Sequence, residues 1–219
     1  MSRQSAVRAR PLGGRADKRA AILAGALAVF ARDGYSRASI DAISAEGGVS
    51  TRTIYNHFAD KARLFEAVIE QSAAAAAADQ IALIERHLDE VAELEPALTA
   101  FGRAWTVSMD AHAAHFSLVS QVDAEPGHVP EAALAAWQEA GPLRVRRELA
   151  ARLRKVADRG LLSVPDPDRA ALHLLLLVSA DSADSGGLEY ATRGARTESE
   201  IAESVAAGVH TFLYGYVPR

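Results

Sequence analysis

Residues 39–58 hold side chains whose types and spacing suit contact with another molecule, and they read SIDAISAEGGVSTRTIYNHF. Hydroxyl, guanidinium and phenol groups follow one another at Thr51, Arg52, Thr53 and Tyr55. Such groups exchange hydrogen bonds with base edges in the major groove of DNA, where each base pair presents a distinct pattern of donors and acceptors. The stretch is therefore a candidate DNA-reading surface.

Two short helices joined by a tight turn would hold these groups in place. Ser39 is a suitable start for one helix, the pair Gly47-Gly48 breaks it, and Ser50 caps the next. This arrangement is a helix-turn-helix, whose second helix enters the major groove. The small core between the two helices is predicted to consist of Ile43, Val49 and Ile54.

Longer helices are predicted on both sides of this unit. The apolar spacing over residues 16–33 predicts an amphipathic helix that stops at Gly34, and Asp60 caps a fourth helix that runs towards His87. Strand-like alternation is missing, so the predicted fold class is all-α, with about nine helices. The later helices are predicted near residues 96–112, 113–124, 130–159, 167–185 and 197–215.

Charge is distributed unevenly along the chain. Residues 1–63 hold eleven Lys and Arg against five Asp and Glu, a net charge of +6, whereas the other 156 residues have a net charge of −10. A basic segment of this kind is expected where a protein meets phosphate. Residues 1–15 are predicted to form a flexible basic arm, whose arginines either reach an adjacent minor groove or make no contact.

Several classes of protein are disfavoured by what the sequence lacks. There is no cysteine, which excludes disulfides, cysteine-based zinc sites and thiol redox chemistry and suits a cytoplasmic protein. There is no Gly-x-Ser-x-Gly elbow, glycine-rich phosphate loop or HExxH sequence, so neither an enzyme nor a cofactor is expected. His112 and His115 lie near Asp110 but lack a third ligand at fixed spacing, so no metal site is predicted.

A membrane protein is not expected either. The apolar run at residues 20–31 follows arginines, as in a secretion signal, but its bulky residues recur on one helical face. No apolar run reaches the about 18 residues that a membrane-spanning helix requires.

The N-terminal part resembles the DNA-binding domain of tetracycline-repressor-like (TetR) transcriptional regulators. The resemblance covers roughly residues 16–69, and residues 136–162 look like one common type of C-terminal domain in that family. Ser44 and Gly47 depart from the pattern, since the family usually has alanine there, and a glycine costs a helix about 1 kcal/mol. The matching residues are Ile22, Leu23, Phe30, Gly34, Ile43, Gly48, Val49, Ser50, Thr53, Ile54, Tyr55, His57, Phe58, Lys61 and Leu64.

The resemblance implies roles for the polar residues of this domain. Thr51, Arg52 and Tyr55 would contact base edges, and His57 and Lys61 would hold backbone phosphates. Simpler alternatives stay open: a core position for Tyr55, a solvated charge at Arg52, and an ordinary surface lysine at Lys61. Thr53 would either contact DNA or serve in packing and capping. The full predicted set of DNA contacts is Ser39, Ser50, Thr51, Arg52, Thr53, Tyr55, Asn56, His57 and Lys61.

The predicted domain order is an arm at residues 1–15, a DNA-binding domain at 16–62, and a ligand-binding and dimerisation domain at 63–219. A small-molecule pocket, or else plain core, is predicted at Phe101, Trp105, Met109, Phe116 and Trp137. The last two helices have broad apolar faces that either pair two subunits or pack within one. The predicted dimer interface consists of Leu174, Leu175, Val178, Val205, Val209 and Phe212.

Together these features predict a homodimeric repressor that binds a palindromic double-stranded DNA operator and leaves it when an unknown small-molecule effector binds. The alternative is a helical, dimeric interaction module without DNA binding. Such a module would not be expected to keep DNA-competent side chains at Thr51, Arg52, Tyr55 and Lys61.

Overall fold

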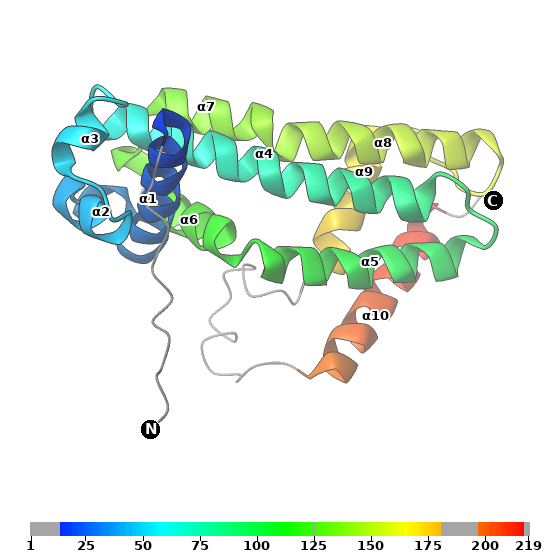
Figure 1. Cartoon of the computed structure of the whole chain (residues 1–219). Helices are drawn as coiled ribbons and strands as arrows, with labels where there is room; N and C mark the ends of the chain where they lie inside the picture. Colours follow the sequence, from blue (N-terminus) through cyan, green and yellow to red (C-terminus); the bar gives the residue numbers. More distant parts are fainter. Residues whose placement is uncertain (1–13, 125, 181–196, 217–219) are drawn as a thin grey trace.

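The computed structural model describes residues 14–124, 126–180 and 197–216, and all regular secondary structure within them is helical (Figure 1). This confirms the all-α prediction. The predicted arm falls outside the described residues except for Gly14 and Arg15.

The first three helices form the predicted helix-turn-helix unit. They are α1 (Arg15–Arg37), α2 (Ile40–Glu46) and α3 (Thr51–Tyr55). Gly34 has a φ of 76°, which interrupts α1 where the sequence predicted its end, so that residues 35–37 form a separate last turn. The Ser39 hydroxyl accepts a hydrogen bond from the Ala42 N–H and caps α2.

Two glycines let α1 and α2 approach each other closely. A Cβ atom on Gly25 of α1 would lie 2.6 Å from the backbone nitrogen of Gly47, and one on Gly47 would lie 2.9 Å from the carbonyl oxygen of Ala21. Neither position has room for a larger side chain without movement of the backbone. This contact favours glycine at position 47.

The long helix α4 (Lys61–Leu88) begins six residues after the end of α3, with Asp60 capping it through the Arg63 N–H. Figure 1 shows α1, α2 and α3 at one end of the molecule and α4 running from there to the other end, between α5 and the α7–α8 pair. The later helices are α5 (Leu94–Ala111), α6 (Ala113–Ala124), the 3-10 turn η1 (Pro126–His128), α7 (Glu131–Ala140), α8 (Pro142–Asp158), α9 (Pro167–Val178) and α10 (Glu198–Tyr216).

Two of these helices correct the sequence prediction. The single helix expected at residues 130–159 is two helices, because the backbone turns at Gly141 (φ −119°, ψ −96°) and Pro142 begins the second one. The helix expected at 167–185 ends at Val178, and residues 181–185 lie outside the described part of the chain.

The described residues form two apolar cores, and α4 contributes to both. One core joins α1, α2, α3 and the first half of α4 with Leu118 and Val122 of α6 and Ala133 of α7. The other joins the second half of α4 with α5, α8, α9 and α10. The DNA-reading helices therefore share a core with part of the C-terminal half. The domain boundary at 62/63 remains a prediction.

Candidate functional site

The helix α3 is held in place by its own cap and by one buried residue. The Ser50 hydroxyl accepts a hydrogen bond from the Thr53 N–H at 3.1 Å and lies 2.8 Å from the Thr53 hydroxyl. Ile54 is buried in the N-terminal core together with Ile43 and Phe58. The Thr53 side chain thus belongs to the cap, which is one of the two roles the sequence left open.

The opposite face of α3 is largely exposed to solvent. The Tyr55 side chain is 56% exposed, and Arg52 and Asn56 are exposed beside it. Thr51 and His57 are half-buried at either end of this face. A phenol, a guanidinium and an amide thus lie on one outward surface, which has the hydrogen-bonding groups that reading base edges requires. Their contacts with DNA remain a prediction.

Lys61 has partners within the protein that the sequence does not predict. Its Nζ donates to the carbonyl oxygens of Tyr35 (2.9 Å), Ala38 (3.1 Å) and Ser36 (3.4 Å), and it lies 4.6 Å from the centroid of the Tyr35 ring. An ammonium group has three N–H donors, and all three have acceptors here. The side chain therefore fastens the start of α4 to the last turn of α1.

A cavity of about 230 Å³ lies between α4 and the helices α5 to α9. Three of the five residues predicted to line a pocket do so: Trp105, Phe116 and Trp137. The other two residues do not line this cavity. Phe101 is fully buried in the C-terminal core, and Met109 accepts a hydrogen bond from the Ser179 hydroxyl at 3.9 Å outside the cavity. Helical spacing places all five residues on apolar helix faces. Which of these faces line a cavity depends on how the helices pack together.

The polar residues of this cavity were not predicted from the sequence. They are Gln80 of α4, His115 of α6, Gln138 of α7 and Arg146 of α8. Gln80 carried a recognisable signal, because a large polar residue stands on the buried face of an alanine-rich helix, at helical spacing from Ala73 and Ala76. Arg146 carried none, since it is one arginine among several in the same helix.

His115 lies at the boundary between this cavity and a second one. Its Nδ1 is 2.9 Å from the Ser72 hydroxyl, which itself donates to the carbonyl oxygen of Ile69 at 3.2 Å. Burial, helped by the nearby charge of His112, lowers the pKa of His115 to about 4, so the ring is neutral near pH 7. The Ser72 hydroxyl is thus within hydrogen-bond distance of both the His115 ring and the Ile69 carbonyl oxygen.

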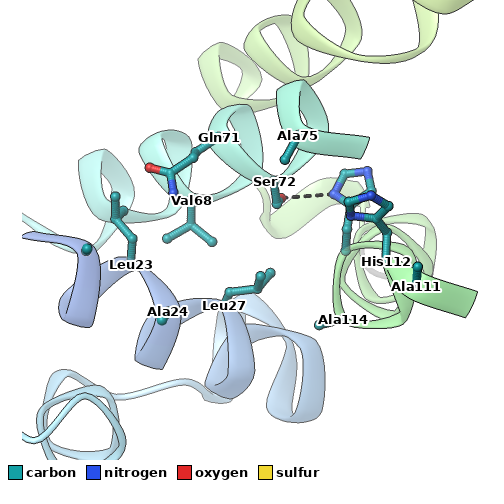
Figure 2. A pocket seen from close by; sticks show the side chains of 12 residues that line it. Leu23, Ala24, Leu27, Val68, Gln71, Ser72, Ala75, Ala111, His112 and Ala114 are labelled. Atoms are coloured by element: carbon teal, nitrogen blue, oxygen red, sulfur yellow. Dashed lines mark hydrogen bonds between the residues drawn. The ribbon is translucent and has the colours of Figure 1, made fainter. Parts of the chain in front are cut away.

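The second cavity, of about 290 Å³, lies where α1 meets α4 and the start of α6. Figure 2 shows Leu23 and Leu27 of α1 opposite Val68 of α4, with His112 beyond Ser72 at one end. The His112 Nε2 is 2.8 Å from the Asp79 carboxylate. The two histidines thus have different partners, and the described residues include no group of three His, Asp or Glu side chains placed to bind a metal ion.

Most residues predicted for the dimer interface lie inside the protomer. Five of its six members are buried inside the protomer, and the sixth, Leu175, packs against the same core and lines the cavity. The most apolar face of each helix is used for internal packing, so a second subunit cannot reach it. The five buried residues are Leu174, Val178, Val205, Val209 and Phe212.

The outward faces of α9 and α10 are themselves partly apolar. Leu172, Leu176 and Tyr214 are among the large hydrophobic side chains that the protomer leaves exposed, and Leu176 is 60% exposed.

Among the described residues, no helix is long and apolar enough to cross a membrane.

Comparison with known proteins gives matches over both halves of the chain. Residues 22–68 match the bacterial regulatory proteins of the tetR family, and residues 96–218 match the C-terminal domain of AefR-like transcriptional repressors. No curated protein matches the chain.

Solved structures resemble it over nearly its whole length. A TetR-family transcriptional regulator from Mesorhizobium loti MAFF303099 is 25% identical, with a TM-score of 0.79 over 94% of this chain and 100% of that chain. The flavonoid-responsive regulator FrrA is 27% identical, with a TM-score of 0.66 over 93% and 99% of the two chains. A TetR-family regulator from Pseudomonas syringae pv. tomato str. DC3000 is 25% identical, with a TM-score of 0.63 over 92% and 98%.

Proposed function

The chain belongs to the tetR family of bacterial regulatory proteins, with an AefR-like repressor C-terminal domain, and on this premise we propose that it is a dimeric repressor released from DNA by a small molecule. That it is a DNA-binding transcriptional regulator follows from the family. The proposal concerns how binding is controlled, which residues meet the DNA, and where the effector and the second subunit bind.

One observation carries the proposal: a single unbroken helix links the DNA-reading unit to the cavity. Helix α4 starts at Lys61, shortly after α3, and its middle turns line the 230 Å³ cavity with Ala73, Ala76 and Gln80. A molecule that fills the cavity therefore touches the same helix that leads to α3. Helices transmit a tilt along their length, since their hydrogen-bonded backbone bends little.

The start of α4 moves together with the reading unit. Lys61 ties α4 to the last turn of α1, and Phe65 packs edge-on against Phe30 of α1, with ring centroids 4.9 Å apart. A tilt of α4 would thus carry α1, α2 and α3 with it. In a dimer, the tilt changes the separation of the two α3 helices, which must match about one turn of DNA, roughly 34–36 Å. The effector shifts the equilibrium only as far as it binds the two states differently.

The second subunit is assigned to the outward faces of α9 and α10. These faces present Leu172, Leu176 and Tyr214 to solvent in the protomer, and apolar groups gathered on one surface are typical of an interface. A two-fold axis there would pair each helix with its copy. Leu172 also lines the cavity, so an effector would lie directly beneath this face.

FrrA is a flavonoid-responsive regulator, and this supports the sensing part of the proposal, because its structure matches this chain over 93% of its length. For this chain, the effector is a molecule small enough for the 230 Å³ cavity.

The proposal is tested by selection from genomic DNA. The purified protein is incubated with sheared genomic DNA of its source at moderate salt, and the retained fragments are sequenced. Enrichment of a palindromic site is expected, because a symmetric dimer reads two half-sites. A folded dimer that enriches no sequence would instead support a helical interaction module without DNA binding.

A further inference from the structure

We propose that the cavity between α4 and α8 binds a compact aromatic carboxylate, with Arg146 as the residue that selects its negative charge. This inference rests on the proposed function, because it names the chemical class of the effector. It is carried by the charge, the unpaired polar groups and the shape of the cavity.

Among the described residues that line the cavity, Arg146 is the only side chain with a full charge near pH 7, and none is Asp or Glu. Its neighbours in α8 are paired: Arg147 lies 2.8 Å from the Glu139 carboxylate, and Arg152 lies 2.7 Å from that of Asp89. Arg146 makes no ion pair or hydrogen bond within the described part of the chain, and its Nε is buried. A half-buried guanidinium without a carboxylate partner favours binding of an anion. Its planar group can donate two parallel hydrogen bonds to the two oxygen atoms of a carboxylate.

Two further polar side chains line the cavity. Gln80 is only 7% exposed, and its amide lies at the cavity wall. The indole N–H of Trp137 is buried without an acceptor. Buried polar groups are nearly always hydrogen-bonded, so such groups at a cavity wall indicate a missing partner. Both side chains offer N–H donors, which suit the oxygen atoms of a carboxylate.

The other walls are apolar and largely aromatic. Trp105, Phe116 and Trp137 come from three different helices, and Val119 and Leu175 complete the lining between them. Aromatic rings pack favourably against one another in stacked or edge-on arrangements. The cavity, at about 230 Å³, is smaller than the about 300–1,000 Å³ of pockets for drug-sized ligands. The size therefore favours a ligand of one or two fused rings over a long acyl chain.

Calorimetric titration of the full chain with 2-naphthoate and with its neutral analogue 2-naphthamide tests this directly. The wild-type protein is expected to bind the naphthoate at least about tenfold more tightly. In the Arg146→Gln variant this preference should disappear, and in Arg146→Lys part of it should return with the charge. Arg144→Gln is the matched control, because Arg144 is exposed on the same helix and lines neither of the two cavities described above.

The inference is overturned if the amide binds as tightly as the carboxylate, if neither binds, or if Arg146→Gln keeps the wild-type preference. Thermal melts show whether each variant is folded. If Arg146→Gln does not fold, the naphthoate preference of Arg146→Lys decides the test.

A second readout separates this inference from the proposed function. Release of the selected DNA by 2-naphthoate is followed by fluorescence anisotropy. Charge-selective binding without release would contradict the control mechanism and leave the ligand class standing. Release that persists unchanged in Arg146→Gln would contradict the ligand class and leave the control mechanism standing.

Discussion

At the residue scale, Lys61 is a charged residue beside the DNA-reading helix that has a structural role. Its ammonium group satisfies three carbonyl oxygens at the end of α1, which have no partners within that helix. The resemblance to the family assigned it to a phosphate, and nothing in its sequence position distinguishes the two roles. We therefore propose that Lys61 positions the reading unit and does not itself bind DNA.

The Lys61→Met variant is expected to unfold more easily, by about 1.5–3 kcal/mol, because hydrogen bonds from a charged group are lost. Urea denaturation of the wild type and the variant measures this difference. The dependence of DNA affinity on salt should keep its slope. A slope reduced by about one unit would show that Lys61 neutralises a phosphate after all.

His115 makes stability depend on pH. Its pKa in the folded protein is about 4, below the ordinary value of 6.5, because burial disfavours the charged ring. The unfolded chain therefore takes up a proton near pH 6.5, while the folded protein resists it. The contribution of His115 to the free energy of unfolding is fully present above pH 6.5. It is lost as the pH falls towards 4, by up to about 3 kcal/mol.

Denaturation of the wild type and of His115→Asn across this range checks the prediction. The asparagine amide can still form a hydrogen bond with Ser72, and it does not titrate. The variant should lose less stability than the wild type between pH 6.5 and pH 4. Equal losses would show that other groups cause the acid sensitivity.

At the element scale, the contact between α1 and α2 sets the geometry of the helix-turn-helix. Gly25→Ala is expected to destabilise the protein by about 1–3 kcal/mol, because the new Cβ would lie 2.6 Å from the Gly47 nitrogen. Helix propensity alone predicts the opposite sign, a gain of about 1 kcal/mol. Thermal unfolding decides between them. Ala24→Gly, at the neighbouring exposed position, serves as the control, since it changes propensity without changing this contact.

The helices of the reading unit were predictable because their signals are local. Ser39, Ser50 and Asp60 cap the helices that follow them, and Gly34 interrupts α1 as expected. The break at Gly141 was missed, although a glycine before a proline is a start signal, because the apolar spacing continues across it. Local patterns thus predict where most helices begin, and a continuous pattern can hide a turn.

At the scale of the whole molecule, sequence periodicity did not show which apolar faces are internal. Val205 and Val209 were assigned to a dimer interface, yet they pack in the C-terminal core. Three lining residues of the cavity were predicted from their type, whereas Gln80 and Arg146 were not. Whether an apolar or charged side chain faces a core, a cavity or solvent depends on how several helices meet, which no single stretch of sequence encodes.

The outward face of α9 provides a test of the assembly. Leu176→Glu should convert the dimer to a folded monomer, because a charge would be buried between the subunits but is harmless in the protomer, where Leu176 is 60% exposed. Sedimentation velocity measures the mass in solution. Val107→Glu on α5 is the matched control, since Val107 is 67% exposed and lies outside the proposed interface. If Val107→Glu is monomeric while Leu176→Glu stays dimeric, the interface lies elsewhere.

The most direct test of sequence-specific binding through α3 is an anisotropy titration with two duplexes, the selected palindrome and a scrambled sequence of the same composition. The wild type should prefer the palindrome by at least about 10³-fold at physiological salt. Tyr55→Ala should weaken palindrome binding by about 1–3 kcal/mol, with less effect on the scrambled duplex. Because Tyr55 is 56% exposed, the variant should stay folded. Equal affinity of the folded wild-type dimer for both duplexes would contradict sequence-specific binding, and equal losses in Tyr55→Ala would contradict base reading by Tyr55.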